Sequence, residues 1–366
     1  MKGRTTALTP GLAVLALLSM ACCAQAAVDM PWWAQYMGRT QFSAEDESQM
    51  AAKLEKDHLT PLVAGRESAE VTGARTDALA LTQDGRATAE FRAAVSKVVV
   101  QKLDALLPQA VAQRNRLGVA IVVARVQNPE SLPLLLKLLG DGGSGEVYSS
   151  VRYWAAKGLA GDGVRAAILN GTVPIRVVAA KLGEALQRET DVLCVSQLFK
   201  VLQALGTESV TDVLIDGAAA KAKSEAFDLS RREAVEAMKT AVEALRQAYD
   251  RPPAASKQRI VATLAQILVR TPPHGDSLDL IVAIDDVLSA MTKEKTALAD
   301  AVKEQRSQSR LLDPKLIDLV WLQQLNWVEL LLKTDNRQIR LAARPAALDW
   351  TPEESAKVVR KNAAAP

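Results

Sequence analysis

Two similar segments, Val151-Arg-Tyr-Trp-Ala-Ala-Lys-Gly-Leu159 and Ile175-Arg-Val-Val-Ala-Ala-Lys-Leu182, follow one another closely in the chain. In each, an apolar residue and an arginine precede the tripeptide Ala-Ala-Lys, and a leucine closes the segment. Alanine and leucine are strong helix formers, and paired alanines let helix backbones approach closely. We therefore expect both segments to be the first helices of stacked helical hairpins.

The composition favours an all-α fold around this pair. The chain has 366 residues, of which 49% are hydrophobic and only 4% aromatic. Apolar residues recur at steps of three and four from Phe91 to Leu107, which is one face of a long helix. A capping box, Ser230-Arg-Arg-Glu233, predicts a helix that ends at Tyr249. Further helices are expected at 109–126, 132–139, 147–159, 163–169, 174–188, 191–205 and 207–223.

The regions that flank these helices are less regular. In 27–87 we expect one short helix from a Ser43 cap to about Lys56, and then a loosely structured stretch at 58–85, with short strands possible. That stretch contains one proline and three glycines. Residues 88–250 form the repeat region, 251–350 a C-terminal helical region, and 351–366 a short helix with a frayed tail.

The order of elements in 88–205 resembles a known family. A helix, an Asn128-Pro129 turn, a leucine-rich helix, a glycine-rich loop and the Val-Arg-x-x-Ala-Ala motif are similar to bacterial HEAT-like repeats of the short phycobilisome-lyase type. The resemblance implies an α-solenoid with a ridged partner-binding surface. Arg152 and Arg176 are 24 residues apart but Arg116 and Arg152 are 36 apart, so the expected array is irregular, with a helical C-terminal extension.

The N-terminus predicts export. Lys2 and Arg4 precede an apolar run, and Ala24-Gln25-Ala26 offers small residues to a signal peptidase, so 1–26 is expected to be a signal peptide and the protein periplasmic or extracellular. Alternatively, Ser19-Met-Ala-Cys22 is similar to a lipobox, which would place an acylated Cys22 at a membrane. No later run approaches 18 apolar residues, so no integral membrane segment is expected after signal removal.

Charge and motifs argue against several kinds of chemistry. Without the signal peptide, the chain has 43 basic and 42 acidic residues, and this near balance gives no indication of nucleic-acid binding. His58 and His274 have no metal-ligand spacing, and Cys194 lies on an apolar face where a buried, inert thiol is expected. We predict no catalytic, cofactor-binding or metal site. The Gly140–Gly145 loop follows a helix instead of a strand, so a hairpin connection is favoured over a phosphate cradle.

Partner binding is the function that this leaves. Tyr153 and Trp154 adjoin the glycine-rich loop, and Trp32 and Trp33 are either a docking segment or a plug for one end of the core. The arginines either line a groove for acidic partner groups or brace the repeats; they are Arg114, Arg116, Arg125, Arg152, Arg165 and Arg176. We predict a non-catalytic protein-binding scaffold or adaptor of the cell envelope, with no oligomer indicated. The alternatives are an enzyme or enzyme accessory with a site near Gly140–Gly145, and a lipid-anchored envelope component.

Overall fold

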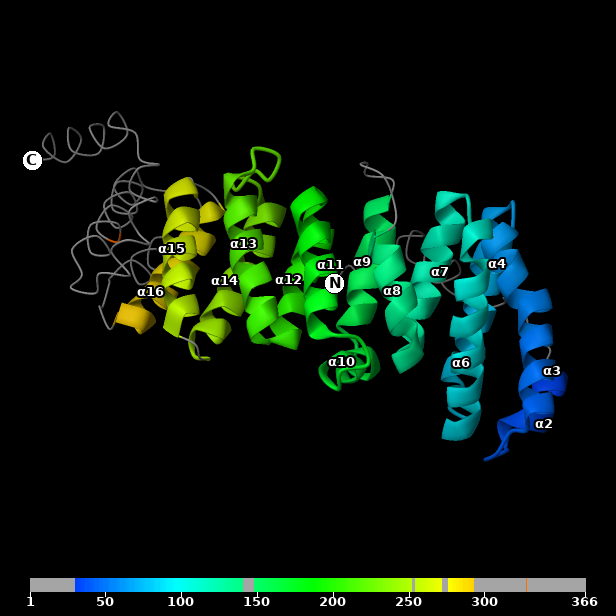
Figure 1. Ribbon diagram of the computed structural model, residues 1–366. Coiled ribbons are helices and arrows are strands. Elements are labelled where there is room, and N and C mark those ends of the chain that lie inside the picture. Colours follow the sequence, from blue (N-terminus) through cyan, green and yellow to red (C-terminus); the bar gives the residue numbers. More distant parts are fainter. Residues whose placement is uncertain (1–29, 141–147, 252–253, 272–275, 293–326, 328–366) are drawn as a thin grey trace, which may run out of the picture. The chain divides into compact units, whose positions relative to one another are not determined.

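The computed structural model describes residues 30–140, 148–251, 254–271, 276–292 and 327 (Figure 1). Within these ranges every regular element is a helix and no strand occurs, which confirms the predicted all-α class. The chain divides into two compact units between Val122 and Val123, and each is described by itself. The HEAT-like, solenoid character of the array stays a prediction, as does export, because 1–29 lie outside the described residues.

The first unit is built from short helices and one long one. Ser43 is the helix cap that was predicted, and it forms a capping box with Asp46: the Asp46 N–H donates to Ser43 Oγ at 3.1 Å, and the Ser43 N–H donates to the Asp46 carboxylate at 2.9 Å. Thr88 caps the long helix by accepting the N–H of Phe91 at 3.2 Å. The elements are α2 (Met30–Met37), α3 (Ala44–Leu54), the π-helical η1 (Glu55–Leu59), α4 (Thr60–Ala64), α5 (Ser68–Gln83), α6 (Ala89–Leu106), the 3-10 turn η2 (Leu107–Gln109) and the first part of α7 (Gln113–Val126).

The expectation of a loosely structured stretch at 58–85 was wrong, because η1, α4 and α5 occupy nearly all of it. Pro61 lies in the first turn of α4, where a helix does not need its N–H. Gly65 ends that helix, and Gly73 lies inside α5, whose Val71, Ala74, Ala78 and Leu81 are buried. The glycines and the proline thus mark helix ends or are tolerated within a packed helix. The predicted boundary at 87–88 falls inside the first unit.

The second unit packs its helices in two layers (Figure 1). In one layer α8, α11, α13 and α15 contact one another in that order, and in the other α9, α12, α14 and α16 do. Hairpins α11–α12, α13–α14 and α15–α16 join the layers. The bounds are η3 (Pro129–Ser131), α8 (Leu132–Gly140), α9 (Ser149–Leu159), α10 (Asp162–Leu169), α11 (Ile175–Arg188), α12 (Val192–Leu205), α13 (Glu208–Lys223), α14 (Arg232–Tyr249), α15 (Ala254–Arg270) and α16 (Ser277–Thr292).

The two similar segments do not occupy equivalent places, contrary to our expectation. The first, α9, packs against α8 and α12 and is the second helix of its hairpin, whereas the second, α11, packs against α8 and α13 and is a first helix. The short α10 lies between them in sequence. This extra helix lets α11 start a new hairpin instead of taking the place that α9 has in its own. Accordingly Arg152 and Ala156 are buried, while the matching Arg176 and Ala180 are exposed. The shared motif encodes a helix but not its neighbours.

Helix ends in this unit follow local hydrogen bonds. Asp191 caps α12 by accepting the N–H of Cys194 at 2.8 Å. The capping box predicted at Ser230 does not form: α14 begins one residue later than expected, after Arg231. The reason is a turn before the helix, in which the Ser230 N–H donates to the Asp228 carboxylate at 2.9 Å. The part of the predicted C-terminal helical region beyond 292 and the short helix expected in 351–366 lie outside the described residues, except for the buried, helical Trp327.

Candidate functional site

The tryptophans near the N-terminus divide between core and surface. Trp33 on α2 is fully buried and meets Phe91 of α6 edge-on, with 6.2 Å between ring centroids. Trp32 is half-buried, its ring lies tilted against that of Tyr36 with 5.1 Å between centroids, and the Lys53 ammonium is 5.8 Å from its ring. Of the two alternatives, a docking segment or a plug of the core, the buried Trp33 fits the plug. Its ring is not available to a partner.

Arg116 braces its own unit. Its side chain is half-buried, and its Nε donates to the carbonyl of Ala110 at 2.8 Å. The neighbouring Asn115 is buried and donates to the carbonyls of Leu62 and Gly65, both at 3.1 Å. These contacts tie the start of α7 to α4, so the beginning of α7 contributes to folding more than to a binding surface.

Arg152 is a buried brace in the second unit. Its guanidinium is 5% exposed and pairs with the fully buried Glu189, with 2.6 Å between Nε and Oε2. Ser149 connects to both, donating to Glu189 at 3.0 Å and accepting from Arg152 at 3.2 Å. Of the two alternatives for this arginine, the geometry supports bracing. The partly exposed Arg165, which pairs with Asp162 at 2.9 Å, and the exposed Arg176 differ from it, so the arginines do not share one role.

Glu189 is the centre of a buried polar cluster. It also accepts the backbone N–H groups of Thr190 at 3.0 Å and Asp191 at 2.9 Å, while the Lys221 ammonium donates to its carbonyl. Burial raises the pKa of the Glu189 carboxyl, but the hydrogen bonds from Arg152 and the Asp191 backbone outweigh it and bring the pKa to about 2. Glu189 is thus ionised at neutral pH and matched by the Arg152 cation.

The other ionisable members of this cluster are adapted to burial. Burial, followed by the nearby Glu189 charge, raises the pKa of the Cys194 thiol far above its usual range, which makes it a poor nucleophile and fits the inert thiol expected from the sequence. Burial lowers the pKa of Lys221, and its ammonium bonds to main-chain carbonyls of Glu189 and Gln187. The cluster holds α9, the α11–α12 connection and α13 together, and its groups satisfy one another.

An aromatic and basic patch lies beside this cluster, on α9 and the end of α7. Tyr153 and Trp154 are half-buried, with ring centroids 5.8 Å apart and nearly perpendicular planes. The ammonium of the exposed Lys157 is 4.6 Å from the Trp154 ring, and the guanidinium of the exposed Arg125 is 5.5 Å from it. We call these four residues the α9 patch. The adjoining loop of the predicted alternative site lies, at 141–147, outside the described residues.

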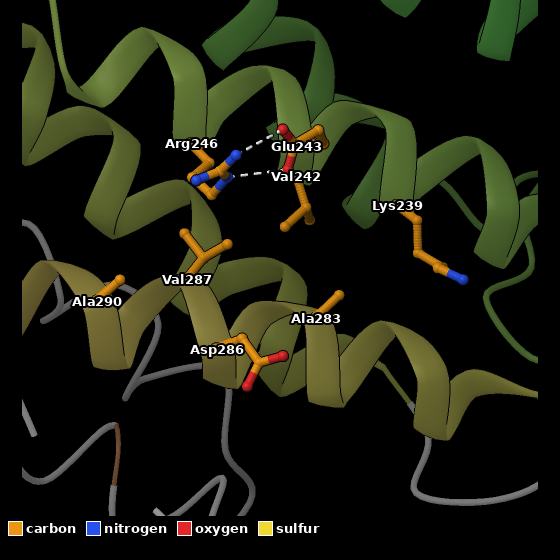
Figure 2. Close-up of a pocket in the computed structure, with 8 residues that line it drawn as sticks. All are labelled: Lys239, Val242, Glu243, Arg246, Ala283, Asp286, Val287 and Ala290. Atoms are coloured by element: carbon orange, nitrogen blue, oxygen red, sulfur yellow. Dashed lines mark hydrogen bonds and ion pairs between the residues drawn. The ribbon is translucent and has the colours of Figure 1, made fainter. Parts of the chain in front are cut away.

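A groove of about 440 Å³ runs between α14 and α16 (Figure 2). Val242 and Val287 point into it, and the small side chains of Ala283 and Ala290 leave the space open. Arg246 forms a two-point ion pair with Glu243 at its edge, with distances of 2.9 and 3.0 Å. This lining contains no group whose position suggests acid–base chemistry, so the groove is a surface feature of the same layer as α9.

Sequence reasoning missed the centre of the buried cluster. Glu189 lies in an Arg-Glu-Thr-Asp run between two helices, and Lys221 lies in an alanine-rich helix with lysines at 221 and 223; both looked solvated. One signal was present in the sequence: Lys221 falls on the same helical face as the apolar Leu214 and Ala218, which predicts burial.

Comparison with family models, with curated proteins and with solved structures found no match for this chain. The HEAT-like resemblance accordingly rests on its own residues. Across the described ranges, no helix combines the length and the apolar character needed to span a bilayer.

Proposed function

We propose that this protein is an exported, non-catalytic adaptor of the cell envelope that binds a protein partner through the α9 patch. The observation that carries the proposal is the pairing of two half-buried aromatic rings on α9 with two exposed cations, Lys157 on the same helix and Arg125 near the end of α7. Tryptophan, tyrosine and arginine are the residues that most often dominate the binding energy of protein interfaces.

The geometry of the patch also favours a particular partner chemistry. Lys157 and Arg125 stand against the Trp154 ring, so their charged heads are held near an apolar surface. A partner segment that offers a carboxylate next to an apolar or aromatic side chain complements both features. Binding is supported over catalysis because the buried ionisable groups nearby, centred on Glu189, satisfy one another.

The direct test is site-specific photo-crosslinking of the full chain in the cells that produce it. A photoreactive amino acid replaces the exposed Ser150, one helical turn before Trp154, so that the patch itself stays intact. The matched control places the same group at the exposed Val177 on α11, in the other layer. We expect a discrete protein adduct from position 150 that is absent from 177 and disappears in Trp154→Ala and in Lys157→Glu.

Two results would count against this function. One is the same set of adducts from positions 150 and 177, which would indicate random collisions. The other is no adduct at 150 together with a clear thermal-shift response to a small molecule that is abolished by Trp154→Ala. That second result would favour the enzyme or accessory alternative, whose site adjoins the same helix.

A further inference from the structure

His58 is an isolated buried imidazole in the first unit. Only 6% of the residue is exposed, and within the described part of the chain neither ring nitrogen forms a hydrogen bond with a protein atom. The nearest ionisable partner is Asp77 of α5, whose Oδ2 lies 3.7 Å from Nδ1, beyond hydrogen-bond range. A polar ring in such a place lowers stability, so its retention needs a reason.

The backbone around His58 is also unusual. η1 is a π-helical turn between α3 and α4, and the N–H of Thr60 bonds to the carbonyl five residues back, at Glu55. Such a turn inserts one residue into an α-helical run and changes which side chains face inward, and π-turns occur frequently at functional sites. Here it turns His58 and Leu59 into the core, where η1 packs against α3, α4, α5 and α6.

The charges around the ring are few. From α5 it faces Asp77, which is itself largely buried. Within η1, Asp57 is paired with Lys53 of α3 at 2.7 Å, and Lys102 of α6 is paired with Glu55 at 2.6 Å. Helix α4, Thr-Pro-Leu-Val-Ala, has no ionisable side chain. Asp77 is therefore the nearest group that could stabilise a charged ring, and it is not positioned to hydrogen-bond with it. Asp57 acts on the ring only through its charge, and Lys53 opposes that effect.

We propose that His58 is an acid-sensitive switch: protonation of its ring opens η1, α4 and α5 away from the rest of the first unit. A buried imidazolium must find water or an acceptor, and in the closed form neither ring nitrogen has a protein partner. The residues set free, Leu59, Leu62 and Val63, are fully buried in the closed form, so opening exposes new apolar surface. An acid-sensitive switch suits a compartment whose pH follows that of the surroundings. The switch does not depend on the adaptor function proposed above.

The direction of the effect follows from linkage. Burial lowers the pKa of His58 below 6.5, and the charges of Asp77 and Asp57 oppose this only in part. Burial in turn raises the pKa of Asp77. For a histidine with a depressed folded pKa, the unfolded form binds more protons, so the stabilisation is complete above pH 6.5 and is lost as the pH falls below it. The closing equilibrium constant should fall by up to about tenfold per pH unit in that range.

The test is hydrogen–deuterium exchange of the full chain at pH 7.5 and 5.5, corrected for the intrinsic exchange rate. We expect peptides from 55–83 to open several-fold more at pH 5.5 in the natural protein. The chain has only one other histidine, so His274→Gln is the matched control and should keep the response, whereas His58→Gln should abolish it. An equal response in both variants, or no response in the natural protein, would overturn the switch.

A second measurement covers the case in which His58→Gln does not fold. With ¹³C-labelled histidine, the natural protein gives two ring signals, and His274→Gln assigns them. The His58 signal should remain neutral at pH 6.5 and titrate below that value together with the opening of 55–83. A His58 ring that titrates at or above pH 6.5 would refute the proposal, because its protonation would then stabilise the closed form.

Discussion

Replacing Glu189 with alanine tests whether the buried cluster holds the second unit together. The substitution leaves the Arg152 guanidinium, 5% exposed, without its counter-ion, and it leaves the N–H groups of Thr190 and Asp191 without their acceptor. Removing one partner of a buried ion pair costs about 3–5 kcal/mol. The depressed pKa points the same way: a drop from 4.5 to about 2 means that the fold favours the ionised carboxylate over the protonated form by roughly 3–4 kcal/mol, at about 1.4 kcal/mol per unit.

The assay is urea unfolding of the full chain at pH 7, followed by circular dichroism and by hydrogen exchange in α9 and α12, which assigns the loss to the second unit. The matched control is Glu184→Ala, which removes an exposed carboxylate on α11 paired with Lys181 and should have little effect. A loss below about 1 kcal/mol for Glu189→Ala, or one equal to that of the control, would refute the reasoning.

The pH dependence provides an independent check on the same residue. Because the folded pKa of Glu189 is depressed, its contribution is present above pH 4.5 and is lost as the pH falls toward 2. The stability difference between the natural protein and Glu189→Gln should therefore shrink across that interval. A difference that stays constant down to pH 2 would mean that the charge of Glu189 does not stabilise the fold.

Further substitutions test packing and capping, each by urea unfolding. Gly158→Ala should destabilise by about 1–3 kcal/mol, because a new Cβ would lie 2.9 Å from the Ala124 Cα and 2.7 Å from Leu135; Gly73→Ala meets nothing within 4 Å and should stabilise α5 by up to about 1 kcal/mol. Ser43→Ala should cost about 1 kcal/mol through loss of the capping box, and a cost near zero would show that α3 needs no cap. Trp33→Ala should lower the free energy of unfolding by about 3–5 kcal/mol because the ring is fully buried. Trp154→Ala should lower it clearly less because that ring is half-buried, and equal losses would place Trp154 in the core.

Most helices could be predicted from the sequence because their apolar residues recur with helical spacing and polar residues mark their starts. Ser43 caps the helix that it was expected to begin, and Asp191 caps the helix expected over 191–205. The failure at 58–85 has a physical cause: Pro61 and Gly65 are strong turn signals, but here they begin and end a five-residue helix. Long-range packing of Leu62, Val63 and Leu81 decides the outcome there, and spacing alone does not report it.

The buried cluster could be predicted only in part. The sequence left open whether Arg152 braces the fold or faces a partner, because a charged residue on a helix has the same local pattern in both cases. Its counter-ion, Glu189, is 37 residues away and lies in a connection between helices. No periodicity links two positions of that kind, so only the folded arrangement of α9 beside α12 reveals the pair.

The brace and three of the four residues of the patch belong to one helix, and this connects stability with the proposed function. Arg152 precedes Tyr153 and Trp154 directly, so the side of α9 that carries the arginine is fixed through Glu189 to the start of α12. Fixing one side of a helix sets its rotation, and therefore sets where the two rings and Lys157 point. A binding patch that is held in place before the partner arrives loses less conformational entropy on binding. Arg176 in the similar segment is exposed and is not followed by aromatic residues. Helix α11 therefore has neither the buried arginine brace nor the aromatic rings of the patch.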